Sequence, residues 1–175
     1  MLFRKKSMEE LDRPNIEEFG RLEKRPVLLV LDNIRSAMNV GSCFRTADAF
    51  ALKSIHLCGI SAKPPHREIA KTAIGAEQSV EWEYHEDVSK ALKHLKFQGY
   101  HIVGVEQAVN SVSLDQWQPK YPLALVMGNE VRGITEDALS YMDEIVEIPQ
   151  WGTKHSINVA VCAGIMAWES IEPLI

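Results

Sequence analysis

The chain has 175 residues, 46% of them hydrophobic and 25% charged, which is typical of a globular domain with a buried core. No apolar run reaches the roughly 20 residues that cross a bilayer, and no apolar stretch of a secretory signal follows the N-terminal charges. The three cysteines form no CxxC pair, so we expect a cytoplasmic protein with no disulfide framework, no metal site and no membrane partner.

The net charge of −5 is unevenly distributed along the chain. Between residues 34 and 75, six Lys or Arg face two acidic residues, whereas from residue 76 onward six face fifteen. Binding of nucleic-acid phosphates requires a local basic surface and not a basic protein. An ordinary solvated basic face explains the pattern equally well, so charge alone selects no partner.

The first 25 residues carry both signs of charge and are followed by Pro26. We expect a polar N-terminal arm over 1–25, with a short helix after Pro14. Residues 26–175 are expected to form one domain, because short runs rich in branched residues alternate with helical patterns throughout. The predicted strands are 27–31, 55–57, 80–84, 101–105, 123–127 and 145–148.

Helical patterns separate these strands. An apolar face at i, i+4 and i+7 predicts a helix over 88–97. Thr135 is a candidate capping hydroxyl for the next helix, and Ser156 is the candidate N-cap of the last one, whose apolar stripe runs over 157–168. Strands that alternate with helices predict an α/β fold, with a mainly parallel sheet covered by helices on both faces.

Three segments place Gly, Asn, Ser or a charge where a predicted strand ends. The first, 39–48, follows the strand over 27–31, and the Asn39 side chain is expected to cap a helix that begins near Val40. Arg45 then lies two turns into that helix. A surface pair between Arg45 and Asp48 at i, i+3 spacing is an equally open interpretation of these residues.

The second segment, 126–133, contains Gly128, which leaves backbone amides exposed to a ligand where a strand ends. The third segment, 148–159, combines a strand end at Pro149 with a helix start at Ser156. A helix N-terminus offers unsatisfied N–H groups and a partial positive charge, which suit a carboxylate or a phosphate. Ligand sites of open α/β sheets lie at the carboxyl ends of strands, so we expect these segments to form one site.

Taken together and in this order, the three segments resemble the signature motifs of the SpoU/TrmH family. Members of that family are S-adenosylmethionine-dependent RNA ribose 2′-O-methyltransferases of the knotted SPOUT superfamily. The resemblance covers about residues 27–168. It implies a deep trefoil knot at the C-terminal end, and a homodimer in which the first and last helices pack together. Val131 stands where the family usually has Gly, so the loop there must avoid positive φ.

The resemblance also implies the site residues. Catalytic roles fall on Asn39, Arg45, Glu130, Ser156 and Asn158. The S-adenosylmethionine pocket is expected against Val105, Glu106, Gly128, Ile148, Ser156 and Ile157. In the family, the arginine of the first motif is regarded as acting on the target ribose hydroxyl. To neutralise a guanidinium at pH 7 costs roughly 7 kcal/mol. We therefore expect Arg45 to stay charged, to hold an RNA phosphate and to be oriented by a bidentate pair with Glu130.

The expected partner is RNA, with tRNA favoured over rRNA because a compact enzyme suits a small structured target. Recognition is expected from the arm, from the dimer surface and from the basic region around Lys63, His66, Arg67 and Lys71. The alternatives are an rRNA 2′-O-methyltransferase, or a non-catalytic RNA-binding member of the same fold, which predicts loss of motif residues that this chain retains. A nicotinamide-dependent oxidoreductase is disfavoured because G-x-G-x-x-G is missing after the first strand, and the P-loop motif is missing as well.

Overall fold

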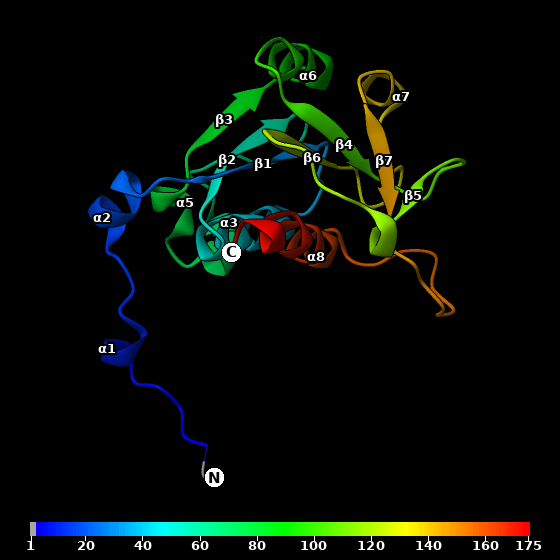
Figure 1. The fold of residues 1–175 in the computed structure, drawn as a ribbon. Coiled ribbons are helices and arrows are strands. Elements are labelled where there is room, and N and C mark those ends of the chain that lie inside the picture. The colour runs from blue at the N-terminus through cyan, green and yellow to red at the C-terminus, as the bar shows by residue number, and fades with distance from the viewer. Residues whose placement is uncertain (1–2) are drawn as a thin grey trace.

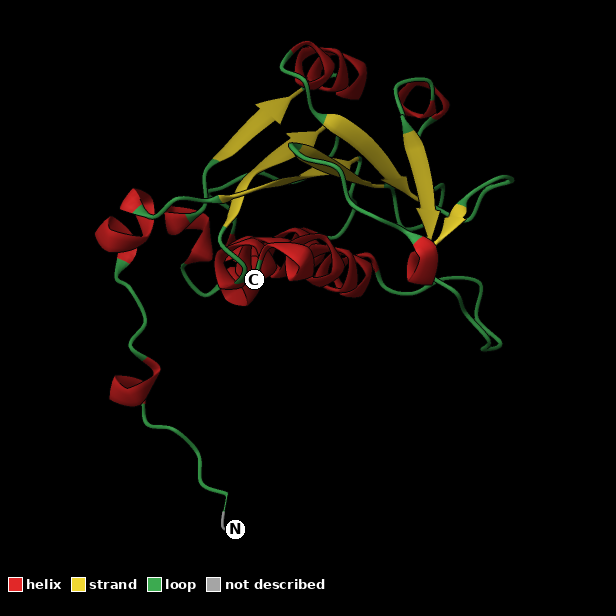
Figure 2. Cartoon of the chain, viewed as in Figure 1, coloured by secondary structure: helices red, strands yellow, loops and turns green. Residues whose placement is uncertain are grey.

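A computed structural model describes residues 3–175 and shows a seven-stranded sheet with helices on both faces (Figures 1 and 2). The strand order is β3-β2-β1-β6-β4-β7-β5, and every neighbouring pair is parallel. The strands are β1 (Arg25–Asp32), β2 (Leu52–Cys58), β3 (Trp82–His85), β4 (His101–Val105), β5 (Val112–Ser113), β6 (Leu123–Met127) and β7 (Glu144–Glu147). The predicted mainly parallel sheet is therefore confirmed.

The helices form two layers. They are α1 (Met8–Leu11), α2 (Ile16–Arg21), α3 (Ala37–Ala49), α4 (Arg67–Ala73), α5 (Ala76–Ser79), α6 (Val88–Phe97), α7 (Glu136–Leu139) and α8 (Val159–Ile171), with 3₁₀ turns at Leu114–Gln116 and Glu172–Leu174. Helices α3, α4, α5 and α8 lie below the sheet in Figure 1, and α6 and α7 lie above it. Each layer has its own cluster of buried side chains, which explains why the central strands are apolar on both faces.

The strand interiors agree with the sequence prediction and the ends differ. β6 is buried throughout and β1 is buried from Val27 onward, as expected for the centre of a parallel sheet. β7 begins and ends one residue before the predicted 145–148, and β3 begins two residues after the start of the predicted 80–84 and ends one residue beyond it. The two-residue β5 was not predicted, because a strand this short has no periodicity to detect.

Two predicted helix starts are wrong in detail. Helix α3 is capped by Ser36, whose hydroxyl accepts from the amide of Asn39, so Asn39 lies inside the first turn. Helix α8 is capped by Asn158, two residues after the predicted Ser156, and the Asn158 side chain accepts from the amides of Ala160 and Val161. The 88–97 helix was predicted with its observed bounds, and Asp87 caps it.

Thr135 precedes α7 as predicted, but its hydroxyl does not cap that helix. Its amide and its hydroxyl both donate to Asp32 Oδ2, each at 2.9 Å. Asp32 is fully buried at the end of β1, and its other oxygen accepts from Asn33 Nδ2 at 2.8 Å. A buried carboxylate is costly unless it is hydrogen-bonded. The Asp32 carboxylate therefore joins the end of β1 to the segment that follows β6.

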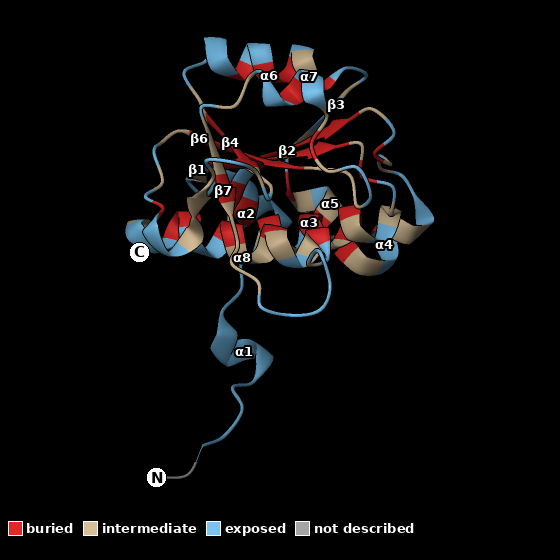
Figure 3. Ribbon diagram, turned by 90° about the vertical axis from the view of Figure 1, so that its right-hand side faces the viewer, coloured by how far each residue is buried: buried red, intermediate tan, exposed pale blue. Residues whose placement is uncertain are grey.

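The N-terminal arm is polar and mostly exposed, and it leaves the globular part of the molecule (Figure 3). Its first two residues, Met1 and Leu2, lie outside the described residues. The predicted helix after Pro14 is α2, which is capped by Asn15. Phe19 of α2 is only 6% exposed and belongs to the larger core cluster, so this helix docks on the domain. Within residues 3–175, the helices are too short or too polar to cross a membrane.

Candidate active site

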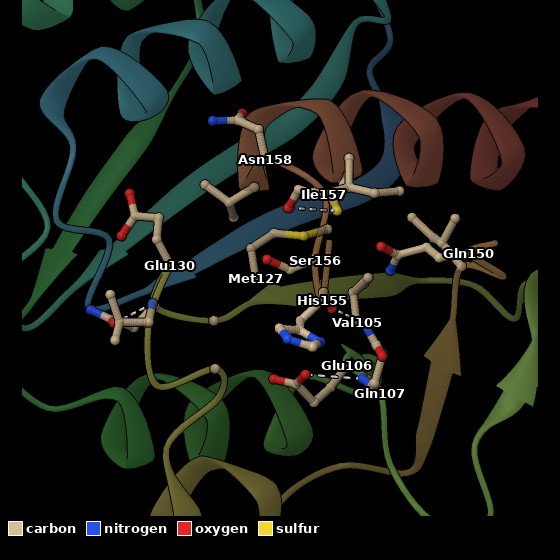
Figure 4. A pocket seen from close by; sticks show the side chains of 17 residues that line it. Val105, Glu106, Gln107, Met127, Glu130, Gln150, His155, Ser156, Ile157 and Asn158 are labelled. Carbon is tan, nitrogen blue, oxygen red and sulfur yellow. Dashed lines mark hydrogen bonds between the residues drawn. The ribbon is translucent and has the colours of Figure 1, made fainter. Parts of the chain in front are cut away.

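A cavity of about 530 Å³ opens at the carboxyl ends of β4, β6 and β7. Its walls come from the segment after β4, the loop after β6 and the segment between β7 and α8 (Figure 4). The lining residues are Val105, Glu106, Gln107, Met127, Gly128, Asn129, Glu130, Val131, Gly133, Ile148, Gln150, His155, Ser156, Ile157, Asn158, Val159 and Cys162. In a parallel sheet these strand ends share one edge, so segments distant in sequence form one site.

The structure brings most of the expected site residues together. All six residues expected at the S-adenosylmethionine pocket line this one cavity. Of the five expected catalytic residues, Glu130, Ser156 and Asn158 line it as well. Asn39 lies directly behind them and is hydrogen-bonded to two of the three. Arg45 does not line this cavity.

A directed chain of hydrogen bonds links the three sequence motifs. Asn158 Oδ1 accepts from two backbone amides of α8, so its amide nitrogen must face away from the helix. That nitrogen donates to Asn39 Oδ1 at 3.1 Å, and Asn39 Nδ2 in turn donates to Glu130 Oε1 at 2.9 Å. The orientation of each amide is therefore fixed by its neighbour, from the start of α8 to the loop after β6.

Glu130 is an acceptor for the segment that precedes α3. Its two carboxylate oxygens accept from the amide of Arg35 at 2.8 Å and from the amide of Ser36 at 3.1 Å, in addition to Asn39. Burial raises the pKa of this carboxyl, but the hydrogen bonds from Arg35, Asn39 and Ser36 outweigh burial and lower the pKa below its ordinary value. Glu130 is thus an anion that holds the start of α3 against the β6 loop.

The expected bidentate pair between Glu130 and Arg45 is wrong, because backbone and amide donors occupy the Glu130 carboxylate. Arg45 lies six residues after Asn39 on α3, about 240° further around the helix axis. It is exposed in a separate groove that Phe50, Lys71 and Gly164 also line. Asp48, its alternative surface partner, instead accepts a hydrogen bond from the Ser79 hydroxyl at 2.6 Å.

The loop after β6 is closely packed around two glycines. A Cβ on Gly128 would lie 2.3 Å from the carbonyl carbon of Gly133, and a Cβ on Gly133 would lie 2.2 Å from Glu106 Oε2. Gly133 also has φ of +69°, whereas Val131 is not among the residues with positive φ, as the sequence required. Asn129 Oδ1 accepts from the amides of Val131 and Arg132, which holds the loop in a tight turn.

Several residues of the cavity wall were not predicted from the sequence. Gln107 Nε2 donates to the carbonyl of His155 at 2.6 Å and so joins the segment after β4 to the one before α8. Gln107 lies two residues after a predicted strand end, which was the available signal, although no distinctive motif marks that segment. Cys162 is half-buried in the wall, and burial raises the pKa of its thiol.

The basic region lies on and beside α4. His66 is the N-cap of this helix, and its Nδ1 accepts from the amide of Glu68 at 3.2 Å. Arg67 opens the helix, and Lys71 lines the same groove as Arg45. The ammonium of Lys63 lies 4.0 Å from the ring centre of Tyr84. Basic side chains thus extend from Tyr84 across α4 to the groove beside α3.

Comparison with known proteins places this architecture in a family. The sequence profile of the SpoU rRNA Methylase family matches residues 26–168. The 23S rRNA (guanosine-2′-O-)-methyltransferase RlmB of Vibrio parahaemolyticus is 30% identical over 174 residues, which are 98% of this chain and 69% of that protein. The tRNA (guanosine(18)-2′-O)-methyltransferase of Escherichia coli is 30% identical over 148 residues, which are 84% of this chain and 64% of that protein.

Solved structures of related proteins share the fold of this chain. The AdoMet-bound rRNA methyltransferase of Sinorhizobium meliloti superposes with a TM-score of 0.81 at 25% identity, covering 90% of this chain and 60% of that one. The chain thus spans about 60% of the length of this structural relative. The A. aeolicus TrmH/SpoU tRNA modifying enzyme shares the fold, with a TM-score of 0.80 at 23% identity, covering 91% of this chain and 82% of that one. The chain belongs to the SpoU rRNA Methylase family.

Proposed function

We propose that this chain transfers a methyl group from S-adenosylmethionine to a ribose 2′-hydroxyl of RNA, and that residues 26–175 are the methyltransferase domain. The observation that carries the proposal is a cavity lined by the second and third motifs, to which Asn39 of the first motif is joined by hydrogen bonds with Glu130 and Asn158. The family and the names of its relatives support the same reaction.

The cavity suits S-adenosylmethionine. Its volume of about 530 Å³ lies within the range of about 300 to 1,000 Å³ usual for small-molecule sites. Apolar side chains of Val105, Met127, Ile148 and Ile157 suit a flat heterocycle, and exposed backbone near Gly128 suits polar groups. When bound, S-adenosylmethionine supplies an electrophilic methyl group on a positively charged sulfur. Glu106, Gly128, Ser156 and the other expected pocket residues would hold it.

Residues of the chain then position the ribose, whose 2′-hydroxyl loses its proton late in the transfer, to the RNA phosphate or to water. Asn39 and Asn158 present fixed amides at the edge of the cavity, and Ser156 presents a hydroxyl in its wall. Arg45 would hold an RNA phosphate and stabilise charge as it develops on the 2′-oxygen. Orientation of the reactants supplies most of the rate, because the leaving sulfur is already activated.

Arg45 reaches the reaction from a second copy of the chain in this proposal. Within one chain it faces a groove beside α8 and not the cavity. The outer side of α8 carries Val161 and Trp168, which are 52% and 46% exposed, so an apolar helix face is uncovered in the single chain. A homodimer through α3 and α8 would cover that face and carry Arg45 toward the partner's cavity.

We further propose that the C-terminal segment is knotted. Both ends of the segment 148–158 line the same cavity as the loops after β4 and β6, and α8 returns from β7 to pack on α3 below the sheet (Figure 1). In a knotted chain, the C-terminal segment is threaded through these loops before α8 forms. This would be an exception to the rule that connections avoid threading.

The RNA substrate is the finer part of the proposal. The Vibrio and Escherichia relatives are named for 23S rRNA and for tRNA, respectively. Lys63, Arg67 and Lys71 provide a basic path that leads to Arg45, and we propose that RNA follows it, with tRNA preferred. Unmodified tRNA and rRNA offered in parallel decide between the two.

The proposed function is tested by calorimetry and methyl transfer. We expect the purified chain to bind S-adenosylmethionine and not NAD, and to transfer labelled methyl to RNA. The Arg45→Lys variant should still bind S-adenosylmethionine but should methylate at least tenfold more slowly, because an ammonium lacks the planar fork. Full activity of that variant would refute the role given to Arg45. Absence of S-adenosylmethionine binding by folded protein would refute the proposed function itself.

A further inference from the structure

A second cluster of ligand-type side chains lies between β2 and β3, outside the candidate active site. It consists of His56, Glu83 and His85, whose nearest nitrogen and oxygen atoms all lie within 4.8 Å of one another. In the register of the two strands, His56 is opposite Glu83 and Cys58 is opposite His85. Because side chains alternate along a strand, Glu83 and His85 project from the same face, where His56 meets them.

The two imidazoles meet edge to edge. His56 Nδ1 and His85 Nε2 are 2.9 Å apart, the ring planes differ by 5°, and the ring centres are 5.0 Å apart. One ring therefore donates a hydrogen to the lone pair of the other. If instead neither of these two nitrogens carries a hydrogen, both rings remain neutral and their two lone pairs point toward the same place.

Both distances from His85 to the other two groups are close to those of a transition-metal site. Zinc binds histidine nitrogen at about 2.0 to 2.1 Å, so two ligand atoms at a tetrahedral centre lie about 3.3 to 3.4 Å apart. The nitrogen–nitrogen distance here is 2.9 Å, and Glu83 Oε2 lies 3.6 Å from His85 Nε2. Movements of a few tenths of an ångström would bring both distances to the required value.

The surroundings favour a cation. The adjoining cavity is lined by Glu77, Glu81 and Glu83 together with His56 and His94, and by one cationic side chain, Lys53. Burial and the neighbouring imidazole lower the pKa of His56 to about 4, and burial lowers that of His85. Histidine binds metals in its neutral form, which a lowered pKa favours. The Glu83 side chain is 64% exposed, so the cluster is open to solvent.

We propose that His56, Glu83 and His85 form a site for one divalent transition-metal ion of the zinc class. Two imidazoles and one carboxylate leave a fourth position for water or for His94, which lines the same cavity. The metal joins β3, the outermost strand, to β2 and stabilises that edge of the sheet (Figure 1). The site lies on the α6 side of the sheet and takes no part in methyl transfer.

Isothermal titration of metal-free full chain with Zn²⁺ tests this inference. We expect one ion per chain, at least tenfold weaker binding in Glu83→Gln, and loss of that ion in His85→Asn. His66→Asn, on the surface of α4, is the matched control and should bind as the unsubstituted chain does. Glu83 is exposed, so its variant remains folded even if His85→Asn is not. Binding unchanged in Glu83→Gln and His85→Asn, or no binding by the unsubstituted chain, overturns the proposal.

Thermal unfolding gives a second readout that is independent of methylation. At Zn²⁺ about 100-fold above its dissociation constant, linkage predicts a melting temperature higher by about 5 °C or more. Co²⁺ in place of Zn²⁺ should give visible absorption bands that disappear in His85→Asn. A melting temperature that Zn²⁺ leaves unchanged would mean that the two histidines form only a hydrogen-bonded pair.

Discussion

At the scale of single residues, Glu130 connects most of the site. It receives donors from the backbone before α3 and from the Asn39 side chain, and through Asn39 it is linked to Asn158. Hydrogen bonds to a charged acceptor are stronger than neutral ones. The same carboxylate therefore stabilises the fold locally and fixes the orientation of two amides beside the cavity.

The pKa of Glu130 gives a prediction of pH dependence. The pKa of Glu130 in the folded chain is below the ordinary value of 4.5. The ionised carboxylate therefore stabilises the fold in full above about pH 4.5, and this stabilisation is lost as pH falls through the folded-state pKa. Glu130→Gln should therefore be less stable than the unsubstituted chain at pH 7, with a difference that shrinks in acid. Urea unfolding at a series of pH values measures this. A difference that stays constant down to pH 3 would contradict the assignment.

Gly128 gives a prediction of packing. In Gly128→Ala the new Cβ would lie 2.3 Å from backbone atoms of the loop after β6, so that loop must shift. We expect a loss of about 1–3 kcal/mol of stability, together with weaker binding of S-adenosylmethionine. Gly20→Ala is the matched control, because no atom lies within 4 Å of its added Cβ. Urea unfolding and calorimetry should show that only the first substitution is harmful; equal effects would refute the packing argument.

Sequence predicted the identity of these residues better than their contacts. Glu130, Asn39 and Asn158 were all expected at the site, but Glu130 was paired with Arg45. Whether a carboxylate meets an arginine or an asparagine depends on the rotation of α3 against the β6 loop. That rotation is set by packing of the whole layer and is not contained in the spacing of the motif.

At the scale of elements, helix α8 has two faces with different roles. Its inner face, which includes Ala163, Met166 and Ala167, is buried against the sheet and α3. Its outer face exposes Val161 and Trp168, and the Trp168 ring centre lies 5.9 Å from that of Phe50 at the end of α3. The apolar stripe predicted from sequence corresponds largely to the outer face, which is why it did not describe the core contact.

The outer face predicts a dimer. Trp168→Glu places a charge where the proposed interface excludes water, so we expect a shift from dimer to monomer in analytical ultracentrifugation. Phe97→Glu is the control, because Phe97 is 90% exposed on α6, on the other side of the sheet. A Trp168→Glu variant that remains a dimer, or an unsubstituted chain that is already a monomer, would contradict the interface.

Helix starts were the least predictable elements. Ser36 and Asn39 are both good N-cap residues three positions apart, and so are Ser156 and Asn158 two positions apart. In each case local propensity permits either start. The observed choice leaves Asn39 free to accept from the amide nitrogen of Asn158, which capping does not use, in a tertiary contact between segments 119 positions apart.

At the scale of the whole molecule, the parallel sheet explains why three distant motifs form one site. Strand direction could be inferred from the alternation of strands and helices, and it placed all the motif loops on one edge. The strand order β1-β6-β4-β7 could not be inferred, because it depends on which crossover each helix takes. The metal-type cluster was missed for the same reason, since His56 and His85 meet only through strand pairing.

Mixed dimers test whether the two halves of the site come from different chains. Arg45→Ala and Asn39→Ala should each be inactive alone, because each disables one half of every site. When the variants are mixed and allowed to exchange subunits, half of the dimers should contain one intact site, which restores about a quarter of normal activity. Activity that stays at background in verified mixed dimers would mean that Arg45 acts within its own chain.

The most direct test of the account is the position of the transferred methyl group. Unmodified tRNA and rRNA are incubated with the chain and S-adenosylmethionine, digested to nucleosides and analysed by mass spectrometry. The account predicts a nucleoside methylated on the ribose 2′-oxygen in at least one pool, and none when Arg45→Ala replaces the unsubstituted chain. A methyl group on a base, or no methylation of either RNA by folded dimeric protein, would contradict it.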